Sequence, residues 1–181
     1  MLRLKTGGIM VEQKQLKTGT TTVGIICNDG LILAADKRAT AGNLIVDSKA
    51  KKVHQINENL VITTAGSVSD IQLQLKLLSA ELKLKGYRTN QSPTVKEAAN
   101  LLSGMVYQNI RVPSMLPGVT HFIMGGADKN GYHIYDLFPD GSLTEIEDYI
   151  SSGSGSVMAY GVLETLYEKD MSIEQGIDLA K

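Results

Sequence analysis

The sequence predicts an α+β protein in which two β-sheets pack face to face between two pairs of helices, a four-layer α/β/β/α sandwich. The predicted elements follow the order strands, two helices, strands, two helices along 181 residues, a length that suits one domain. The apolar runs of the predicted strands are continuous rather than alternating, so both faces of each sheet are expected to be covered. Two stacked sheets with a helix pair on each outer face satisfy both observations.

Extended elements are predicted in the first third of the chain, because β-branched and apolar residues gather there between turn signals. They occupy residues 21–27, 31–35, 39–46, 49–56 and 60–65, of which 39–46 forms a short hairpin around Gly42-Asn43. The turn signal Asn28-Asp29-Gly30 joins the first two strands. Lys52 falls inside the predicted strand 49–56.

The apolar period becomes helical after Gly66, which predicts two consecutive helices. The first begins at a cap among residues 67–70 and ends at Gly86. Its apolar face contains Ile71, Leu75, Leu78 and Leu82 and is widened by Leu73, Leu77 and Leu84. The second follows the capping box Thr94-Val95-Lys96-Glu97 and runs to about Ile110.

Strands and then helices return in the second half of the chain. Strands are predicted at residues 120–127, 132–137 and 143–146. The serine- and glycine-rich stretch 151–156 predicts a loop that leads into a helix over 157–168, and the capping box Ser172-Ile173-Glu174-Gln175 begins the last helix. We expect the strands that precede each helix pair to form one sheet.

Composition and charge exclude several classes of function. A net charge of −1, from 18 basic and 19 acidic residues, gives no electrostatic footprint for nucleic acid. No apolar run approaches the roughly 20 residues of a membrane span. The single cysteine, Cys27, rules out an internal disulfide framework and fits a reducing compartment. Residues 1–19 lack the apolar core of a secretory signal and are expected to be a leader outside the fold.

The segment Gly19-Thr20-Thr21-Thr22 admits two interpretations. One is a glycine turn that leads into a strand, because threonine and valine favour strands. The other is that the Gly19–Thr20 bond is cut, which would give Thr20 both a hydroxyl nucleophile and a free α-amine to act as its base. No Gly-x-Ser-x-Gly elbow and no Cys/His cluster with zinc spacing offers a competing catalytic site.

Other candidate residues lie at predicted strand positions, and each has a purely structural alternative. Asp36 ends the second predicted strand. Lys52 either packs its stem on the sheet with its ammonium in water, or faces Asp36 and Thr20 and favours the threonine alkoxide. The backbone N–H of Gly66 is either part of a simple strand-to-helix turn or an oxyanion donor. The histidines His54, His121 and His133 are interpreted as packed or surface residues.

From residue 20 to residue 181 the chain resembles the β-subunits of archaeal proteasomes, which have the N-terminal-nucleophile hydrolase fold. The resemblance rests on several motifs in family order and near family spacing. These are Gly19-Thr20-Thr21-Thr22-Val23-Gly24, Ala35-Asp36-Lys37-Arg38-Ala39-Thr40, Lys51-Lys52, Thr64-Ala65-Gly66-Ser67, and Gly153-Ser154-Gly155-Ser156 followed by Tyr160-Gly161-Val162-Leu163-Glu164.

The resemblance implies roles for individual residues. Thr20 would be the nucleophile and its freed amine the base, with Asp36 and Lys52 setting the proton balance. The Gly66 N–H would stabilise the oxyanion, and Ser154 would support the amine. The residues implied for the substrate pocket are Ala39, Ala50, His54, Thr64 and Val68. No metal ion and no cofactor is implied.

The resemblance also implies a threonine endopeptidase subunit of a cytoplasmic 20S core, with residues 1–19 as a propeptide removed by self-cleavage and 20–181 as the catalytic domain. Two inner β-rings and two outer α-rings, each of seven subunits, would enclose the sites, and ATP-dependent unfoldase caps would feed unfolded polypeptides. The alternatives are an HslV-type peptidase and a non-catalytic ring subunit. The family continues with an Asp-x-x-Ser motif past the position of Lys181, so the C-terminal part of the fold is expected to be missing.

Overall fold

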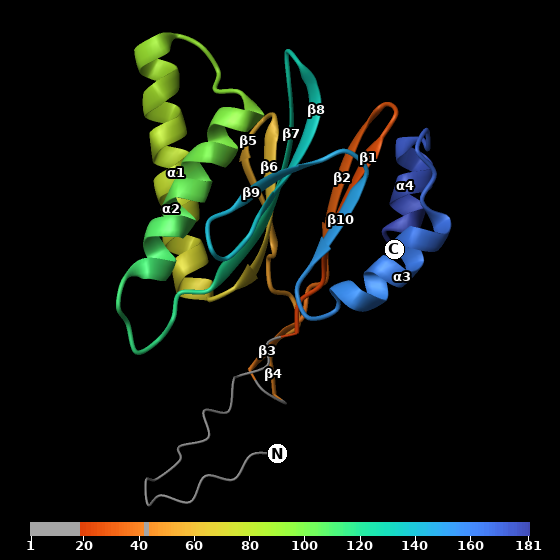
Figure 1. The fold of residues 1–181 in the computed structure, drawn as a ribbon, viewed down its shortest axis with the longest axis horizontal. Coiled ribbons are helices and arrows are strands. Elements are labelled where there is room, and N and C mark those ends of the chain that lie inside the picture. Colours follow the sequence, from red (N-terminus) through yellow and green to blue (C-terminus); the bar gives the residue numbers. More distant parts are fainter. Residues whose placement is uncertain (1–18, 42–43) are drawn as a thin grey trace, which may run out of the picture.

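A computed structural model describes residues 19–41 and 44–181, with the backbone alone for 39–41 and 44–46. In the described part, two antiparallel sheets pack face to face between two pairs of helices (Figure 1). This arrangement confirms the predicted four-layer sandwich. The predicted leader lies outside the described residues apart from Gly19, and so does the tip of the predicted hairpin, Gly42-Asn43.

The smaller sheet has three strands in the order β10-β1-β2. Their bounds are β1 Thr22–Cys27, β2 Gly30–Ala35 and β10 Tyr149–Ser152. The larger sheet has five strands in the order β5-β6-β7-β8-β9. Their bounds are β5 Val53–Asn57, β6 Leu60–Gly66, β7 Thr120–Asp128, β8 Gly131–Leu137 and β9 Leu143–Ile146. A separate hairpin of β3 (Ala39–Ala41) and β4 (Leu44–Asp47) projects from one end of the sandwich (Figure 1).

Helices α1 (Val68–Thr89) and α2 (Val95–Arg111) cover the larger sheet, and α3 (Ser156–Leu166) and α4 (Ile173–Leu179) cover the smaller one (Figure 1). Each helix pair buries an apolar cluster against its sheet, and this burial is the main source of stability for amphipathic helices. Both predicted capping boxes form, at the starts of α2 and α4.

Strands from before and after the first helix pair are mixed in both sheets, because β6 pairs with β7 and β1 pairs with β10. The expectation that each strand group forms one sheet is therefore wrong. The predicted loop 151–156 is also partly wrong, because residues 149–152 form β10 and pair with β1. The side chains of Ser151 and Ser152 are polar, but Ser151 Oγ donates a hydrogen bond of 2.9 Å to the Thr22 carbonyl. Tertiary pairing therefore overrides a composition typical of loops.

Helix α1 continues past Gly86, where the sequence predicts its end. A glycine inside a helix costs only about 1 kcal/mol, whereas Asn90 adopts the left-handed conformation that commonly ends a helix. The predicted widening of the buried face is wrong as well. The leucines expected to provide it are exposed, namely Leu73, Leu77 and Leu84. The stripe that begins at Ile71 is buried as predicted.

Candidate functional site

The two sheets each bring part of the candidate site to the same end of the sandwich. From the smaller sheet, Thr20 precedes β1, Asp36 follows β2 and Ser154 follows β10. These positions lie together because Thr22 pairs with Ala35 on one side and with Ser152 on the other. From the larger sheet, Lys52 immediately precedes β5 and Gly66 is the last residue of β6. The prediction that Lys52 lies within a strand is therefore wrong by one residue.

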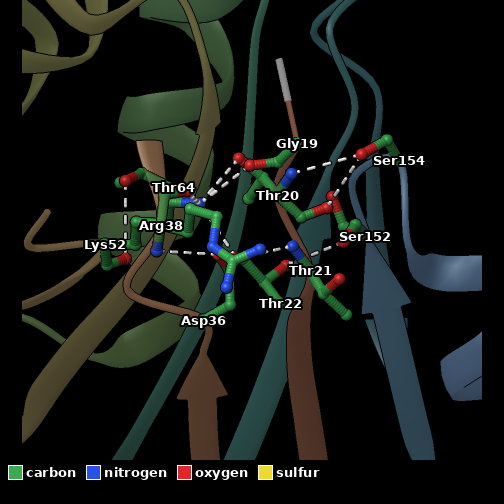
Figure 2. A network of polar contacts seen from close by, with 10 residues as sticks. All are labelled: Gly19, Thr20, Thr21, Thr22, Asp36, Arg38, Lys52, Thr64, Ser152 and Ser154. Carbon is green, nitrogen blue, oxygen red and sulfur yellow. Dashed lines mark hydrogen bonds and ion pairs between the residues drawn. The ribbon is translucent and has the colours of Figure 1, made fainter. Parts of the chain in front are cut away.

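The Lys52 ammonium is the centre of the network that Figure 2 shows. Lys52 is 9% exposed, and its Nζ donates to Asp36 Oδ1 at 2.8 Å and to the Arg38 carbonyl at 2.6 Å. The same nitrogen lies 3.1 Å from Thr20 Oγ1 and 3.1 Å from the Gly19 carbonyl oxygen. A buried cation is costly unless it is paired and hydrogen-bonded, and these contacts meet that requirement. Lys52 thus faces Asp36 and Thr20, and the alternative of a stem packed with its ammonium in water does not hold.

Asp36 is held as an acceptor by three donors. Besides Lys52, the backbone N–H of Thr21 donates to Oδ1 at 2.8 Å and that of Arg38 donates to Oδ2 at 2.9 Å. Partial burial by itself raises the pKa of the Asp36 carboxyl, but the hydrogen bonds from Lys52, Thr21 and Arg38 outweigh it and bring the pKa below its usual value. Asp36 is therefore a carboxylate at neutral pH and fixes the Lys52 ammonium beside Thr20.

The backbone of Thr20 is held by the loop after β10. The Thr20 N–H donates to Ser154 Oγ at 3.2 Å, and the N–H of Gly155 donates to the Thr20 carbonyl at 3.2 Å. Gly153 has a φ of +92°, and a Cβ at this position would lie 2.2 Å from the Thr20 carbonyl oxygen. A side chain at residue 153 would thus displace the nucleophile, which explains the glycine physically.

Gly66 lies at the point where β6 passes into α1. Its φ is +121°, and a Cβ there would lie 2.2 Å from the Val119 carbonyl oxygen. That oxygen accepts a 2.8 Å hydrogen bond from the N–H of Ser67, so the turn around Gly66 is tied to the strand beside it. Gly66 needs this conformation, which residues with a side chain rarely adopt.

A cavity of about 440 Å³ opens beside Thr20 and has mainly apolar walls. Four of the predicted pocket residues line it, namely Ala50, His54, Thr64 and Val68. The side chain of the fifth, Ala39, lies outside the described residues. Burial, and then the charge of the neighbouring Lys51, lowers the pKa of the His54 imidazole despite a backbone hydrogen bond that acts in the opposite direction. A neutral His54 lets the cavity accept apolar groups.

Sequence reasoning missed several contributors to the site. The cavity is also lined by Asp47, Ile71 and Gln72, which no motif marks. Thr21 and Arg38 contribute through their backbone groups, which nearly all amino acids share, so their side chains gave no sign of this role. Gly153 belongs to the quoted motif Gly153-Ser154-Gly155-Ser156, but no role was expected for it.

The described residues offer few other kinds of site. No three of their histidine, cysteine or acidic side chains are grouped so that they could hold a metal ion. No helix in this part of the chain is long and apolar enough to cross a membrane. What the site offers chemically is a hydroxyl beside a paired ammonium, next to a cavity.

Comparison with known proteins gives a consistent family. The profile of the family described as "Proteasome subunit" matches residues 16–181. A "Proteasome subunit beta" of Ferroglobus placidus is 43% identical over 94% of this chain and 79% of its own length. Those of Methanosarcina barkeri and Methanosarcina mazei are both 46% identical over the same shares. The chain therefore belongs to the proteasome subunit family and is similar to the β-subunits of archaeal proteasomes.

Proposed function

We propose that this chain is a threonine endopeptidase subunit of a proteasome core and that it is activated by cleavage of its own Gly19–Thr20 bond. One observation carries the proposal. The Lys52 ammonium contacts both the Thr20 hydroxyl and the carbonyl oxygen of the Gly19–Thr20 bond, each at 3.1 Å. One cation thus contacts both the nucleophile and the carbonyl group that it would attack. Family membership supports a hydrolase that takes part in protein degradation.

In the self-cleavage step, Thr20 Oγ1 attacks the carbonyl carbon of Gly19. The Gly19–Thr20 C–N bond breaks, an ester forms between Gly19 and Thr20 Oγ1, and the hydroxyl proton ends on the released amine. Water then hydrolyses the ester and releases residues 1–19 with a free carboxylate. The Lys52 ammonium stabilises the negative charge that develops on the two oxygens it contacts.

Turnover of a substrate uses the same hydroxyl with a new base. The freed α-amine of Thr20, whose usual pKa is about 7.7–8.0, takes the hydroxyl proton as Oγ1 attacks the substrate carbonyl. The Gly66 N–H, next to the cavity, stabilises the oxyanion. The amine then gives its proton to the leaving peptide amine, and water hydrolyses the acyl ester. Ser154, already within hydrogen-bond distance of this nitrogen, orients it.

The proposed organisation rests on the resemblance to archaeal proteasome β-subunits. Residues 1–19 are the propeptide, and residues 20–181 belong to the catalytic domain. The substrates are unfolded polypeptides that enter a barrel of four stacked seven-membered rings, β inside and α outside, fed by ATP-dependent unfoldase caps. Membership of the family supports assembly with other proteasome subunits.

The proposal is tested on the full chain assembled with a proteasome α-subunit. Intact mass should show a β-chain that begins at Thr20, and the particle should hydrolyse unfolded casein and fluorogenic peptides. Thr20→Ala should assemble, keep residues 1–19 and hydrolyse neither substrate. A wild-type particle that keeps its leader and is inactive would instead indicate a non-catalytic ring subunit.

A further inference from the structure

A second polar network crosses the interface between the two sheets, close to the candidate site but separate from it. His121 of β7 lies between Asp136 of β8 and Ser152 of β10. Its Nε2 is 2.7 Å from Asp136 Oδ1, and its Nδ1 is 2.8 Å from Ser152 Oγ. The imidazole thus joins the five-stranded sheet to the three-stranded sheet through two short hydrogen bonds.

The donors and acceptors of this network match. An ionised carboxylate only accepts, so the contact with Asp136 assigns a proton to Nε2, and in the tautomer that carries only this proton Nδ1 accepts from the Ser152 hydroxyl. Asp136 is 2% exposed and Ser152 is 3% exposed. Removal of His121 would therefore leave two buried polar groups without this partner, which is costly.

The network lies beside the strand residues that carry the two halves of the site. On the larger sheet, His121 pairs with Ala65, the residue before Gly66, and Thr120 pairs with Gly66 itself. On the smaller sheet, Ser152 pairs with Thr22 and lies two residues before Ser154, which contacts the Thr20 nitrogen. Any slip between the sheets at this point changes the position of Thr20 relative to Lys52 and Gly66.

We propose that His121 is a positioning residue, which bridges Asp136 and Ser152 and so holds Thr20 and Ser154 in register with Lys52 and Gly66. This inference rests on the proposed threonine chemistry but concerns residues that take no part in it. His121 does not line the cavity beside Thr20. The burial of Ser152, which is 3% exposed, argues against a catalytic Ser–His–Asp triad, because its hydroxyl is not open to a substrate.

The test measures the rate at which a peptide vinyl sulfone labels Thr20, followed by intact mass on assembled particles. At saturating reagent the labelling is first order, and its rate constant does not depend on what fraction of the particles is folded. A purely structural role would lower the amplitude, whereas a positioning role lowers the rate constant. Misplacement by about 1 Å can cost about 100-fold in rate, so we expect His121→Leu to slow labelling at least tenfold.

Two variants and a control sharpen the test. His121→Gln keeps one donor and one acceptor and should restore most of the rate. His133→Leu is the matched control, because His133 likewise uses both ring nitrogens in polar contacts on this sheet, with the carboxylates of Asp128 and Glu145, but pairs with Gly126 away from the site. Its rate constant should stay within twofold of wild type. Ser152→Ala removes only the hydrogen bond between His121 and the smaller sheet, and it should also slow labelling. It replaces His121→Leu in the test if that variant does not assemble.

The outcomes separate this inference from the function it rests on. Unlabelled wild type, or labelled Thr20→Ala, would overturn the threonine chemistry and the inference with it. Normal wild-type labelling combined with wild-type rate constants in His121→Leu or Ser152→Ala would overturn the positioning role alone. A His133→Leu variant as slow as His121→Leu would also overturn it, since the effect would then not depend on the bridge.

Discussion

Replacement of Lys52 by methionine tests the centre of the proposed mechanism. Methionine keeps an unbranched side chain of similar length but removes the ammonium and all its hydrogen bonds. The lost contacts include those to Thr20 Oγ1 and the Gly19 carbonyl, where charge develops during self-cleavage. Loss of one donor to a developing oxyanion costs about 100- to 1000-fold in rate, so self-cleavage should slow at least 100-fold. This corresponds to about 2.7 kcal/mol in the barrier.

The same change should have a much smaller effect on folding. Asp36 loses its ion pair, but the N–H groups of Thr21 and Arg38 still donate to it, and its side chain is 35% exposed. Solvent screening and these remaining donors limit the loss of stability to about 1–2 kcal/mol. The barrier to self-cleavage should therefore change more than the free energy of unfolding.

The assay follows intact mass over time in particles assembled with the α-subunit, together with peptide hydrolysis and thermal unfolding. Lys49→Met is the matched control, because it removes the same charge from an exposed side chain close by. It should mature and turn over substrate like the wild type. If folded Lys52→Met particles lost residues 1–19 and hydrolysed peptides at the wild-type rate, the role assigned to Lys52 would be refuted.

Three further predictions follow from the same site. Gly66→Ala puts a Cβ on a backbone with a φ of +121° and against the Val119 carbonyl oxygen. It should lower the free energy of unfolding by about 1–3 kcal/mol or more, measured by denaturant unfolding. It should also abolish hydrolysis in peptide assays. Gly153→Ala places a Cβ 2.2 Å from the Thr20 carbonyl oxygen. It should raise the free-energy barrier to Thr20 labelling by more than it lowers the free energy of unfolding. The pKa of Asp36 is lowered on folding from its ordinary 3.8, so its contribution to stability is present above about pH 4 and is lost as the pH falls through the folded-state pKa. Asp36→Asn should then be less stable than wild type at pH 7 by chemical denaturation, and equal stability at both pH 7 and pH 3 would contradict this.

The fold could be predicted from the sequence because its strongest signals are local. Continuous apolar runs between turn signals predicted the strands of both sheets except β10, and the two capping boxes located the starts of α2 and α4. The assignment of strands to sheets could not be predicted in this way. The register of β10 against β1 joins residues about 130 apart, and no local pattern in Ser151 and Ser152 marks them as a strand.

The candidate site, like the fold, could be predicted only as far as local sequence determines it. Thr20, Asp36, Lys52 and Gly66 stood out because glycine, threonine and charged residues at strand ends are chemically suggestive. These four residues lie together only because β2 ends and β5 begins at the same end of the sandwich. That arrangement is set by tertiary structure and not by local sequence. The burial of Leu73 was wrongly predicted for a related reason. The apolar residues of a helix do not by themselves reveal which of them the sheet covers.

The described geometry also bears on how one site can serve two reactions. Thr20 is still joined to Gly19, yet its nitrogen already contacts Ser154 and its hydroxyl already contacts Lys52. In the proposed mechanism, cleavage of the bond would therefore convert a peptide nitrogen into a base without any need for the Thr20 hydroxyl to move. The loop of Gly153 and Gly155 holds the Thr20 carbonyl, on the far side of the residue from the bond that breaks. Because that restraint does not involve the leader, we expect Thr20 to keep the same position before and after the proposed release of residues 1–19.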